Sequence, residues 1–368
     1  MKLSIKNYTR IKAHNYVQIL KNSCADYFSD LNYIDHPPIA INSGIDPTVR
    51  FIGSHISVFK QYIIKNTIPN NGYFIIQDCI RTQNSEYLYN DDSFINWASY
   101  FPSFGIIAPP QNLEKIVSDV FNFLLDELDL TVESIKVRIS KKDNDLVRAI
   151  NRYTKLTDSQ IEFNTKPDIY YTHKLGMNNL AGRNFNIALR DSNSNSFSDI
   201  GNIIMLENHN KPVAVEVALG ITMMLRQILK LQHVLDCFSI IGIQSENLNI
   251  RRKFEDTILV CIYMARVGLK PSATDNKDRL YRKYLRSMSY FRAKTNMSMD
   301  TLENIIFNFE LKEFQHKGES NLVYKQIISY LTRYEAELDT KSIFSKEDSI
   351  IHEMLNMAAI KERNYSEI

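Results

Sequence analysis

The spacing of apolar residues divides the chain into two parts, and the first part, up to about residue 220, mixes helix and strand patterns. Apolar residues gathered on one helical face predict helices at 13–28 and 113–130. Short apolar runs bounded by Gly, Pro and Asn predict strands at 50–53, 73–79, 104–108, 134–139, 169–172, 185–189 and 202–206. Alternation of Val with Ala or Glu over 213–218 predicts another strand. Because the strands arrive in runs, an antiparallel sheet with flanking helices is favoured.

After Gly220 the strand patterns stop. Apolar positions with helical spacing predict helices at 222–238, 252–267, 277–294, 302–309, 322–335 and 350–360. The expected fold class is therefore α+β: an antiparallel sheet with flanking helices, followed by an all-helical domain. We place the domains at 1–240 and 241–368.

Composition limits the class of protein without naming a function. The chain has 368 residues, which favours two domains, and its 44% hydrophobic and 23% charged residues exclude a disordered protein. Four scattered cysteines (Cys24, Cys79, Cys237 and Cys261) form no CxxC, and the eight histidines form no HxH, HxxxH or HExxH. We therefore expect a reduced intracellular protein with no zinc site.

No membrane or export segment is expected. The N-terminus has basic residues but no apolar core of a signal peptide, and the most apolar stretch, 258–265, is far shorter than a membrane span. The sequence thus predicts a soluble, cytoplasmic protein with no membrane partner.

Charge is unevenly distributed. The formal net charge is only +2, yet 251–294 holds twelve Lys or Arg against four Asp or Glu. Such a local excess is typical of a phosphate-binding surface, although a solvated helix face has the same pattern.

Seven short segments, in one order along the chain, carry a resemblance to a known family. They are Asp46-Pro47-Thr48-Val49-Arg50-Phe51 with Val58-Phe59-Lys60, Gln77-Asp78-Cys79-Ile80-Arg81, Pro102-Ser103-Phe104-Gly105, the glycine-flanked stretch 176–187, Asp199-Ile200-Gly201-Asn202-Ile203, Gln232-His233-Val234, and the basic stretch 279–286. Together they resemble the N-terminal part of alanyl-tRNA synthetase, a class II aminoacyl-tRNA synthetase. The resemblance covers roughly residues 20–295, and it implies a class II catalytic domain and a helical tRNA-recognition domain without the family's editing domain.

The resemblance implies ATP, with Mg²⁺, as the cofactor, and a small amino acid and tRNA as partners. Arg81 matches the motif 2 arginine that binds the α-phosphate, a role that suits a guanidinium fork; otherwise it is a surface arginine at a strand end. Glu216 matches the aspartate that pairs with the substrate ammonium, and a carboxylate on a Val/Ala strand is costly unless paired. Asn202 matches the asparagine of the amino-acid pocket, or is a satisfied strand amide.

The motif 3 region departs from the family. When the region is aligned with motif 3 at Glu216 and Gly220, Met223 occupies the position of the family's arginine. When it is aligned at Gln232-His233-Val234, Arg226 occupies that position. Arg226 is the candidate catalytic arginine, or an arginine at the rim of the core. The segment 90–97 lacks the family's motif 2 Arg and His residues, and Asn186 replaces a glutamate. Lost cations would remove charge stabilisation from phosphoryl chemistry.

A candidate RNA-binding face lies on the predicted helix 277–294. Arg279, Arg282, Lys283 and Arg286 share one helical face, with Tyr281 and Tyr284 between them to stack on bases or cover the helix. Asn276 precedes them, where the family has an asparagine near the acceptor stem.

These observations predict an alanyl-tRNA synthetase-like ligase. It would activate alanine or a similar small amino acid with ATP and transfer it to tRNA or another acceptor, in a specialised biosynthetic role. Two alternatives stay open: a non-catalytic tRNA-binding paralogue, and a transferase that uses preformed aminoacyl-tRNA without ATP.

Overall fold

The computed structural model describes residues 8–176, 180–191, 196–314 and 321–340. The chain divides into two compact units. The first contains Met1–Ile80 and Phe101–Phe238, and the second contains Arg81–Tyr100 and Ser239–Ile368. The proposed domains, 1–240 and 241–368, differ from these units in where 81–100 and 239–240 belong.

The first unit is built on one sheet, for which the described residues supply nine strands in the order β1-β2-β3-β9-β8-β7-β4-β5, with β6 on β7. The strands are β1 (Ile34–Asp35), β2 (Tyr73–Ile80), β3 (Tyr100–Ala108), β4 (Ile135–Ile139), β5 (Ile161–Phe163), β6 (Thr172–Lys174), β7 (Leu180–Arg190), β8 (Phe197–Asn208) and β9 (Lys211–Gly220). The central pairs β3–β9, β9–β8 and β8–β7 are antiparallel, whereas the outer pairs β1–β2 and β4–β5 are parallel.

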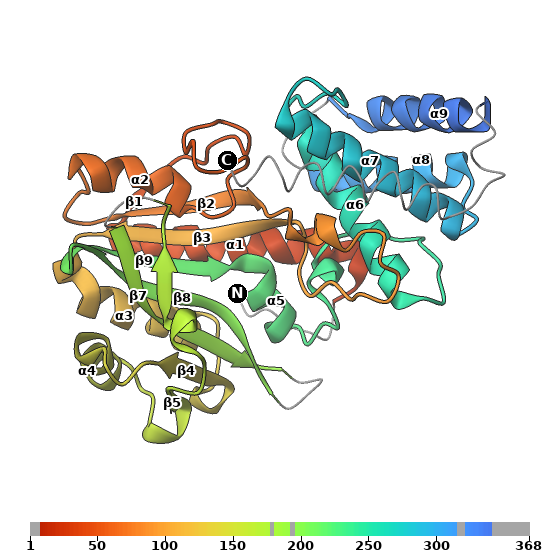
Figure 1. The fold of residues 1–368 in the computed structure, drawn as a ribbon. Helices are drawn as coiled ribbons and strands as arrows, with labels where there is room; N and C mark the ends of the chain where they lie inside the picture. Colours follow the sequence, from red (N-terminus) through yellow and green to blue (C-terminus); the bar gives the residue numbers. More distant parts are fainter. Residues whose placement is uncertain (1–7, 177–179, 192–195, 315–320, 341–368) are drawn as a thin grey trace. The chain divides into compact units, whose positions relative to one another are not determined.

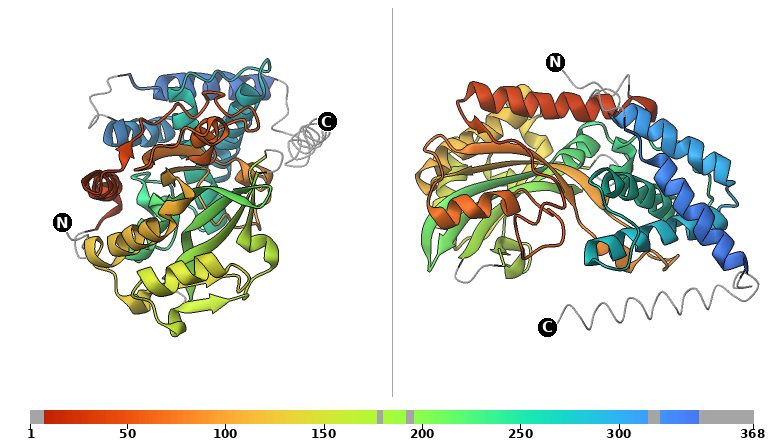
Figure 2. Two further views of the ribbon diagram at one scale, coloured as in Figure 1. Left: turned by 90° about the vertical axis from the view of Figure 1, so that its left-hand side faces the viewer. Right: turned by 90° about the horizontal axis from the view of Figure 1, so that it is seen from above.

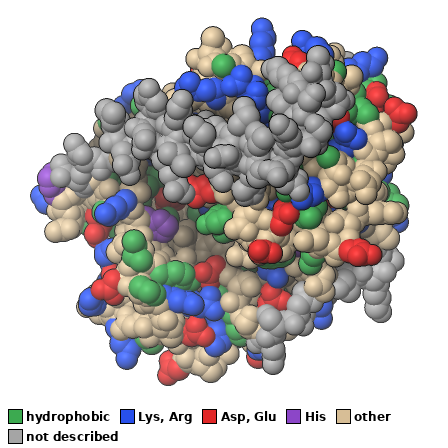
Figure 3. Space-filling model, turned by 45° about the vertical axis from the view of Figure 1, so that its right-hand side comes forward, with side chains coloured by type: hydrophobic (Ala, Val, Ile, Leu, Met, Phe, Trp, Pro, Cys, Tyr) green, Lys and Arg blue, Asp and Glu red, His purple; other side chains and the backbone are tan. Residues whose placement is uncertain are grey.

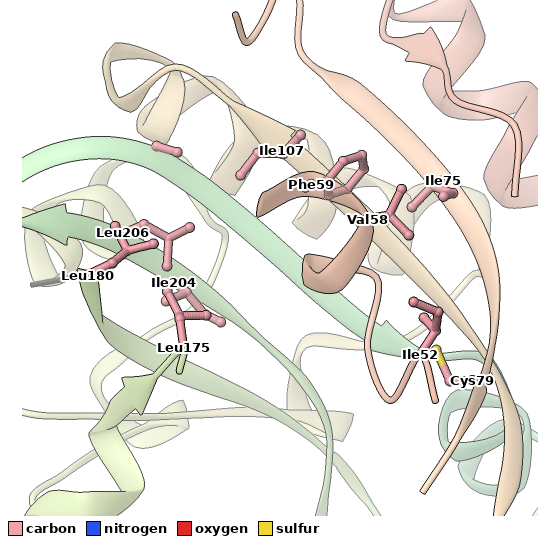
Figure 4. Close-up of a cluster of buried hydrophobic side chains, with 11 residues drawn as sticks. Ile52, Val58, Phe59, Ile75, Cys79, Ile107, Leu175, Leu180, Ile204 and Leu206 are labelled. Carbon is pink, nitrogen blue, oxygen red and sulfur yellow. The ribbon is translucent and has the colours of Figure 1, made fainter. Parts of the chain in front are cut away.

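Helices cover both faces of this sheet (Figures 1 and 2). They are α1 (Ala13–Asp30), α2 (Ile56–Lys65), α3 (Leu113–Asn122), α4 (Asn144–Tyr153) and α5 (Ile221–Ile228). On one face Phe28 of α1 packs on Phe104 of β3, with ring centroids 4.8 Å apart. On the other face α2 contributes Val58 and Phe59 to a buried cluster with Ile107 and other strand residues (Figure 4). Burial of these apolar side chains fixes which face each helix covers.

The second unit is helical in its described residues after 239. Its helices are α6 (Leu248–Arg266), α7 (Asn276–Lys294), α8 (Met299–Phe314) and α9 (Tyr324–Thr340). Helix α6 is buried along most of its length. The segment 81–100 is held against it by Asp256, whose carboxylate accepts from the Ser99 N–H and hydroxyl, each at 2.6 Å. Burial raises the pKa of Asp256 to about 6.

The fold class expected from the sequence is confirmed: a sheet flanked by helices, followed by helices. Some single elements were predicted wrongly. Residues 50–53 are a loop in which Phe51 and Ile52 are buried, held by the bond from Ile52 N–H to Ile41 O, and 168–171 form a 3-10 turn ahead of β6. The helix expected at 222–238 ends at Ile228, because Lys230 takes a left-handed conformation. Helices α2 and α4 were not predicted, and the expected helix 350–360 lies outside the described residues.

In the part of the chain that the structure describes, no helix is long and apolar enough to cross a lipid bilayer.

Candidate functional site

Strand register brings the predicted pocket residues onto one face of the sheet, the face covered by α2. One row across the strands contains Asn184, Ile204, Glu216 and Ile107, and the next contains Asn186, Asn202, Ala218 and Gly105. Residues opposite one another in register, or two apart on one strand, share a face. Asn202 and Glu216 are therefore diagonal neighbours, which are about 7–8 Å apart, with their Cβ atoms somewhat closer.

Glu216 has a partner that the sequence did not reveal. Its Oε1 lies 3.0 Å from Nε2 of His55, and the other ring nitrogen of His55, Nδ1, lies 3.2 Å from the Ser103 hydroxyl. The side chains of His55 and Glu216 are 0% and 2% exposed. Gly105 makes room for the ring, since a Cβ there would stand 2.2 Å from His55. The carboxylate is thus paired, as the cost of burying it requires.

Three acceptor oxygens on this face have no partner among the described residues. They are Oε2 of Glu216, Oδ1 of Asn202 and Oδ1 of Asn184, each buried without a hydrogen bond. Buried polar atoms are normally satisfied, and an unpaired one costs about 1–3 kcal/mol. An ammonium group carries three N–H donors and no acceptor, so it matches a set of acceptors of this kind.

A polar network lies beside Asn202 and Asn184 on the β4 side of the sheet. The Asn202 amide lies 3.2 Å from Nε2 of His173, and the amides of Asn184 and Asn186 both donate to the Tyr170 carbonyl. Arg138, opposite Asn186 in register, donates to Asp199, which also accepts from the Tyr170 hydroxyl. Burial acts against the charged form of Arg138, but bonds to Glu162 and Tyr170 and the nearby Asp199 leave its pKa raised. These contacts fix the asparagine side chains in place.

The motif 1-like residues have a structural role. Asp46 forms an ion pair with Lys60 at 2.7 Å and accepts from the N–H and hydroxyl of Thr48, and Lys60 also donates to that hydroxyl. Burial raises the pKa of Asp46, but these bonds outweigh it and lower the pKa below its usual value. The network ties the loop that precedes α2 to Lys60 of α2, and His55 lies at the end of this loop.

The first candidate position for the motif 3 arginine, three residues after Gly220, is Met223. A Cβ on Gly220 would stand 3.1 Å from the Met223 side chain, which shows that Met223 packs against this glycine. Arg226, one turn later on α5, donates from Nη2 to Asp191 at 2.8 Å. The guanidinium of Arg226 is therefore partly neutralised by a nearly buried carboxylate of the same unit.

Arg81 is exposed, and its backbone N–H donates to the Ser99 carbonyl. It belongs to the second unit, whereas Asn202, Glu216, Gly220 and Arg226 belong to the first. Within the first unit the structure brings Asn202 and Glu216 together on one face, and Gly220 ends the same strand as Glu216.

Helix α7 presents the predicted cations on the side away from its core residues. Arg279 is exposed, and Arg282, Lys283 and Arg286 are partly exposed. Tyr281 and Tyr284 are fully buried and belong to the core. In this conformation the expectation that bases stack on them is therefore wrong. Asn276 begins the helix, and its side-chain oxygen, Oδ1, accepts from the Arg279 guanidinium. Arg286 lies over the ring of Tyr334, with its guanidinium carbon 5.1 Å from the centroid.

Part of the excess charge in 251–294 is neutralised within the second unit. Arg266, Arg292 and Lys294 pair with Glu310, Glu335 and Asp91, all outside this stretch. On the face shown in Figure 3, Lys and Arg side chains are interspersed with Asp and Glu side chains. The remaining candidates for phosphate contact are the cations of α7 named above.

Comparisons with known proteins find distant structural neighbours. A scan against models of protein families finds no match, and a search of curated proteins finds none. Among solved structures, the RNA binding domain of threonyl-tRNA synthetase from Cryptosporidium parvum superposes with a TM-score of 0.40 and 11% identity, over 61% of this chain and 66% of that one.

The second is a putative threonyl-tRNA synthetase from Aeropyrum pernix, with a TM-score of 0.40 and 11% identity over 68% of this chain and 69% of that one. The third is asparaginyl-tRNA synthetase from Entamoeba histolytica in complex with asparaginyl-adenylate, with a TM-score of 0.40 and 10% identity over 62% and 66%. Likeness at this level identifies neither a substrate nor an activity. The resemblance to the alanyl enzyme rests on the sequence motifs alone.

Sequence reasoning missed His55, Ser103 and Asn184. His55 lies inside the motif 1-like stretch, between the two segments that carry the resemblance, which contain Asp46 and Lys60. The signal that could have found it is the pair Glu216 and Gly105: a buried carboxylate on one strand, and a residue without a side chain on the strand beside it.

Proposed function

We propose that this protein acts on the aminoacyl group of a small amino acid, alanine or one of similar size, and transfers it to an acceptor. The observation that carries the proposal is the set of unpartnered buried acceptors at Glu216 and Asn202. These two residues match the family's amino-acid pocket in the sequence and are neighbours on one face of the sheet. The substrate ammonium would donate to Glu216 Oε2 and Asn202 Oδ1.

The first route to the aminoacyl group is activation by ATP. Arg81, exposed after β2, is the candidate for the α-phosphate, which a guanidinium binds through two parallel N–H bonds. Bound ATP would supply the activating phosphate, with Mg²⁺ neutralising its charge. Among the described residues, no three His, Cys, Asp or Glu side chains are grouped to hold a metal ion, so Mg²⁺ would be held mainly by the nucleotide.

The second route is use of a preformed aminoacyl ester, such as aminoacyl-tRNA. Met223 packs on Gly220, and Arg226 is paired with Asp191. Neither position thus offers an unpaired cation to a triphosphate, and this observation favours the ATP-independent route. In both routes tRNA is the proposed RNA partner, bound through Arg279, Arg282, Lys283 and Arg286 of α7, with Asn276 near the acceptor stem.

Pyrophosphate exchange, assayed with a panel of amino acids in the presence and absence of total tRNA, separates the two routes. The ATP route predicts exchange with a small amino acid, and Arg81→Ala should lower it on the order of 10²-fold, as loss of one preorganised charge contact does. Lys325→Ala, an exposed cation of the same unit, is the matched control. Absence of exchange and of ATP binding by calorimetry would eliminate the ATP route and leave the ester route.

A further inference from the structure

Three buried side chains on the pocket face are connected in the order of a nucleophile, a base and a carboxylate. Ser103 Oγ lies 3.2 Å from His55 Nδ1, and His55 Nε2 lies 3.0 Å from Glu216 Oε1. Ser103 and Glu216 come from β3 and β9, which are paired in the sheet, and His55 comes from the residue before α2. A nucleophile within reach of a base that a third group orients is the signature of covalent acyl transfer.

The carboxylate decides which ring nitrogen can act as the base. Nε2 lies at ion-pair distance from Glu216 without hydrogen-bond geometry, and because a carboxylate oxygen only accepts, the tautomer that suits this pair has its proton on Nε2. In that tautomer Nδ1 is an acceptor for the Ser103 hydroxyl, which also has the Leu219 carbonyl oxygen as an acceptor at 3.5 Å. The resulting tautomer is the one that can remove the serine proton.

The second oxygen of the same carboxylate remains for a ligand. Oε1 of Glu216 faces His55, whereas Oε2 is buried and has no hydrogen-bond partner among the described residues. His55 Nε2 also has no bond of hydrogen-bond geometry, so the pair is held at ion-pair distance, and Oε2 is left as an acceptor for a ligand. One carboxylate can thus orient the base through one oxygen and hold a substrate ammonium through the other.

We infer that Ser103, His55 and Glu216 form an acyl-transfer site, in which Ser103 accepts the aminoacyl group of an aminoacyl ester. This inference rests on the proposed binding of the amino group at Glu216, and it adds a covalent intermediate to the ester route. The substrate class is an ester of a small α-amino acid, of which the 3′ ester of aminoacyl-tRNA is the biological example.

The reaction balances without a cofactor. Ser103 Oγ bonds to the ester carbonyl carbon while its proton passes to His55 Nδ1. The tetrahedral adduct expels the alcohol oxygen, which takes that proton, and leaves an aminoacyl ester on Ser103. An amine or water then attacks this ester, gives its proton to His55, and the proton returns to Ser103 as the product leaves.

Incubation of the full chain with alanine p-nitrophenyl ester, followed by intact and peptide mass spectrometry, tests the inference. We expect one alanyl adduct, mapped to Ser103, which is absent in Ser103→Ala and present in Ser103→Cys as a thioester. Ser54→Ala, beside His55, is the matched control and should keep the adduct. His55→Gln should slow adduct formation on the order of 10²-fold or more, as loss of a general base does.

Two outcomes overturn the inference while leaving the proposed function intact. One is an adduct in Ser103→Ala equal to that in the wild type. The other is a wild type that binds the non-reactive amide of alanine by calorimetry and yet gives no adduct with the ester. Failure to bind either the amide or the ester would instead overturn the proposed function, on which the inference depends.

Discussion

At Gly105 the absence of a side chain makes room for the His55 ring against the sheet. His55 in turn lies between Ser103 and Glu216, so one position without a Cβ supports three polar side chains. A buried carboxylate that lost this partner would cost several kcal/mol. The arrangement of the pocket therefore depends on a residue that has no chemistry of its own.

Gly105→Ala should displace His55, because the added Cβ would stand 2.2 Å from the ring. We expect a loss of about 1–3 kcal/mol in the free energy of unfolding, typical of overpacking in a core. The same change in a His55→Ala background should cost less, and denaturant titrations of the four proteins measure the difference. Equal costs in both backgrounds would show that the ring does not occupy this space.

Asp256 predicts a dependence of stability on pH. Its pKa is raised to about 6 in the folded chain, mainly by burial, and is near 3.9 when unfolded. Between these values the folded state binds more protons, so this group's contribution is full below about pH 4 and is lost as pH rises through 6.

Asp256→Asn removes this titration. The unfolding free energy of the wild type relative to the variant should therefore fall by up to about 3 kcal/mol between pH 4 and pH 7. Chemical denaturation of both proteins at a series of pH values measures it. A difference that stays constant with pH would contradict the burial of this carboxylate.

Among the elements, long periodic segments were predictable and loops were not. The helix at 13–28, the strands over 185–189, 202–206 and 213–218, and the helices over 252–267 and 277–294 all have counterparts in the structure, because each has one strongly apolar face or a clear alternation. Helix α2 was missed, since its sequence was considered only as a motif. In the run 50–53, Phe51 and Ile52 are buried in a loop, and a short apolar pattern cannot distinguish such a loop from a strand.

Helix α7 gives a prediction about RNA. Replacing Arg282, Lys283 and Arg286 with Ala should weaken tRNA binding and lower the log–log salt slope by about two to three, since each phosphate contact adds roughly 0.7–0.9. The matched control is Lys312, Lys325 and Arg333 to Ala, which removes the same charge from α8 and α9. Anisotropy titrations at several salt concentrations measure both quantities. Equal losses in the two triple variants would mean that α7 has only a solvated basic face.

Across the whole molecule, the candidate site could be predicted only in part. Glu216 and Asn202 were found from sequence, because polar residues stand out within apolar strands and match a family pattern. Their register across β8 and β9 and the approach of His55 from the loop before α2 depend on contacts between distant segments. No periodicity encodes such contacts. Phosphate binding by Arg81 and Arg226 remains a prediction. The ion pair of Arg226 with Asp191 weakens the case for Arg226, because its charge is already partly neutralised.

Recognition of a substrate ammonium at Glu216 is the central claim, and calorimetry with two matched esters tests it most directly. Alanine methyl ester and methyl propionate differ only in the amino group. The claim predicts that the wild type binds the alanine ester and not the propionate. It also predicts that Glu216→Gln, which keeps the shape and removes the charge, loses most of that binding. Equal binding of the two esters, or unchanged binding of the alanine ester by Glu216→Gln, would contradict it.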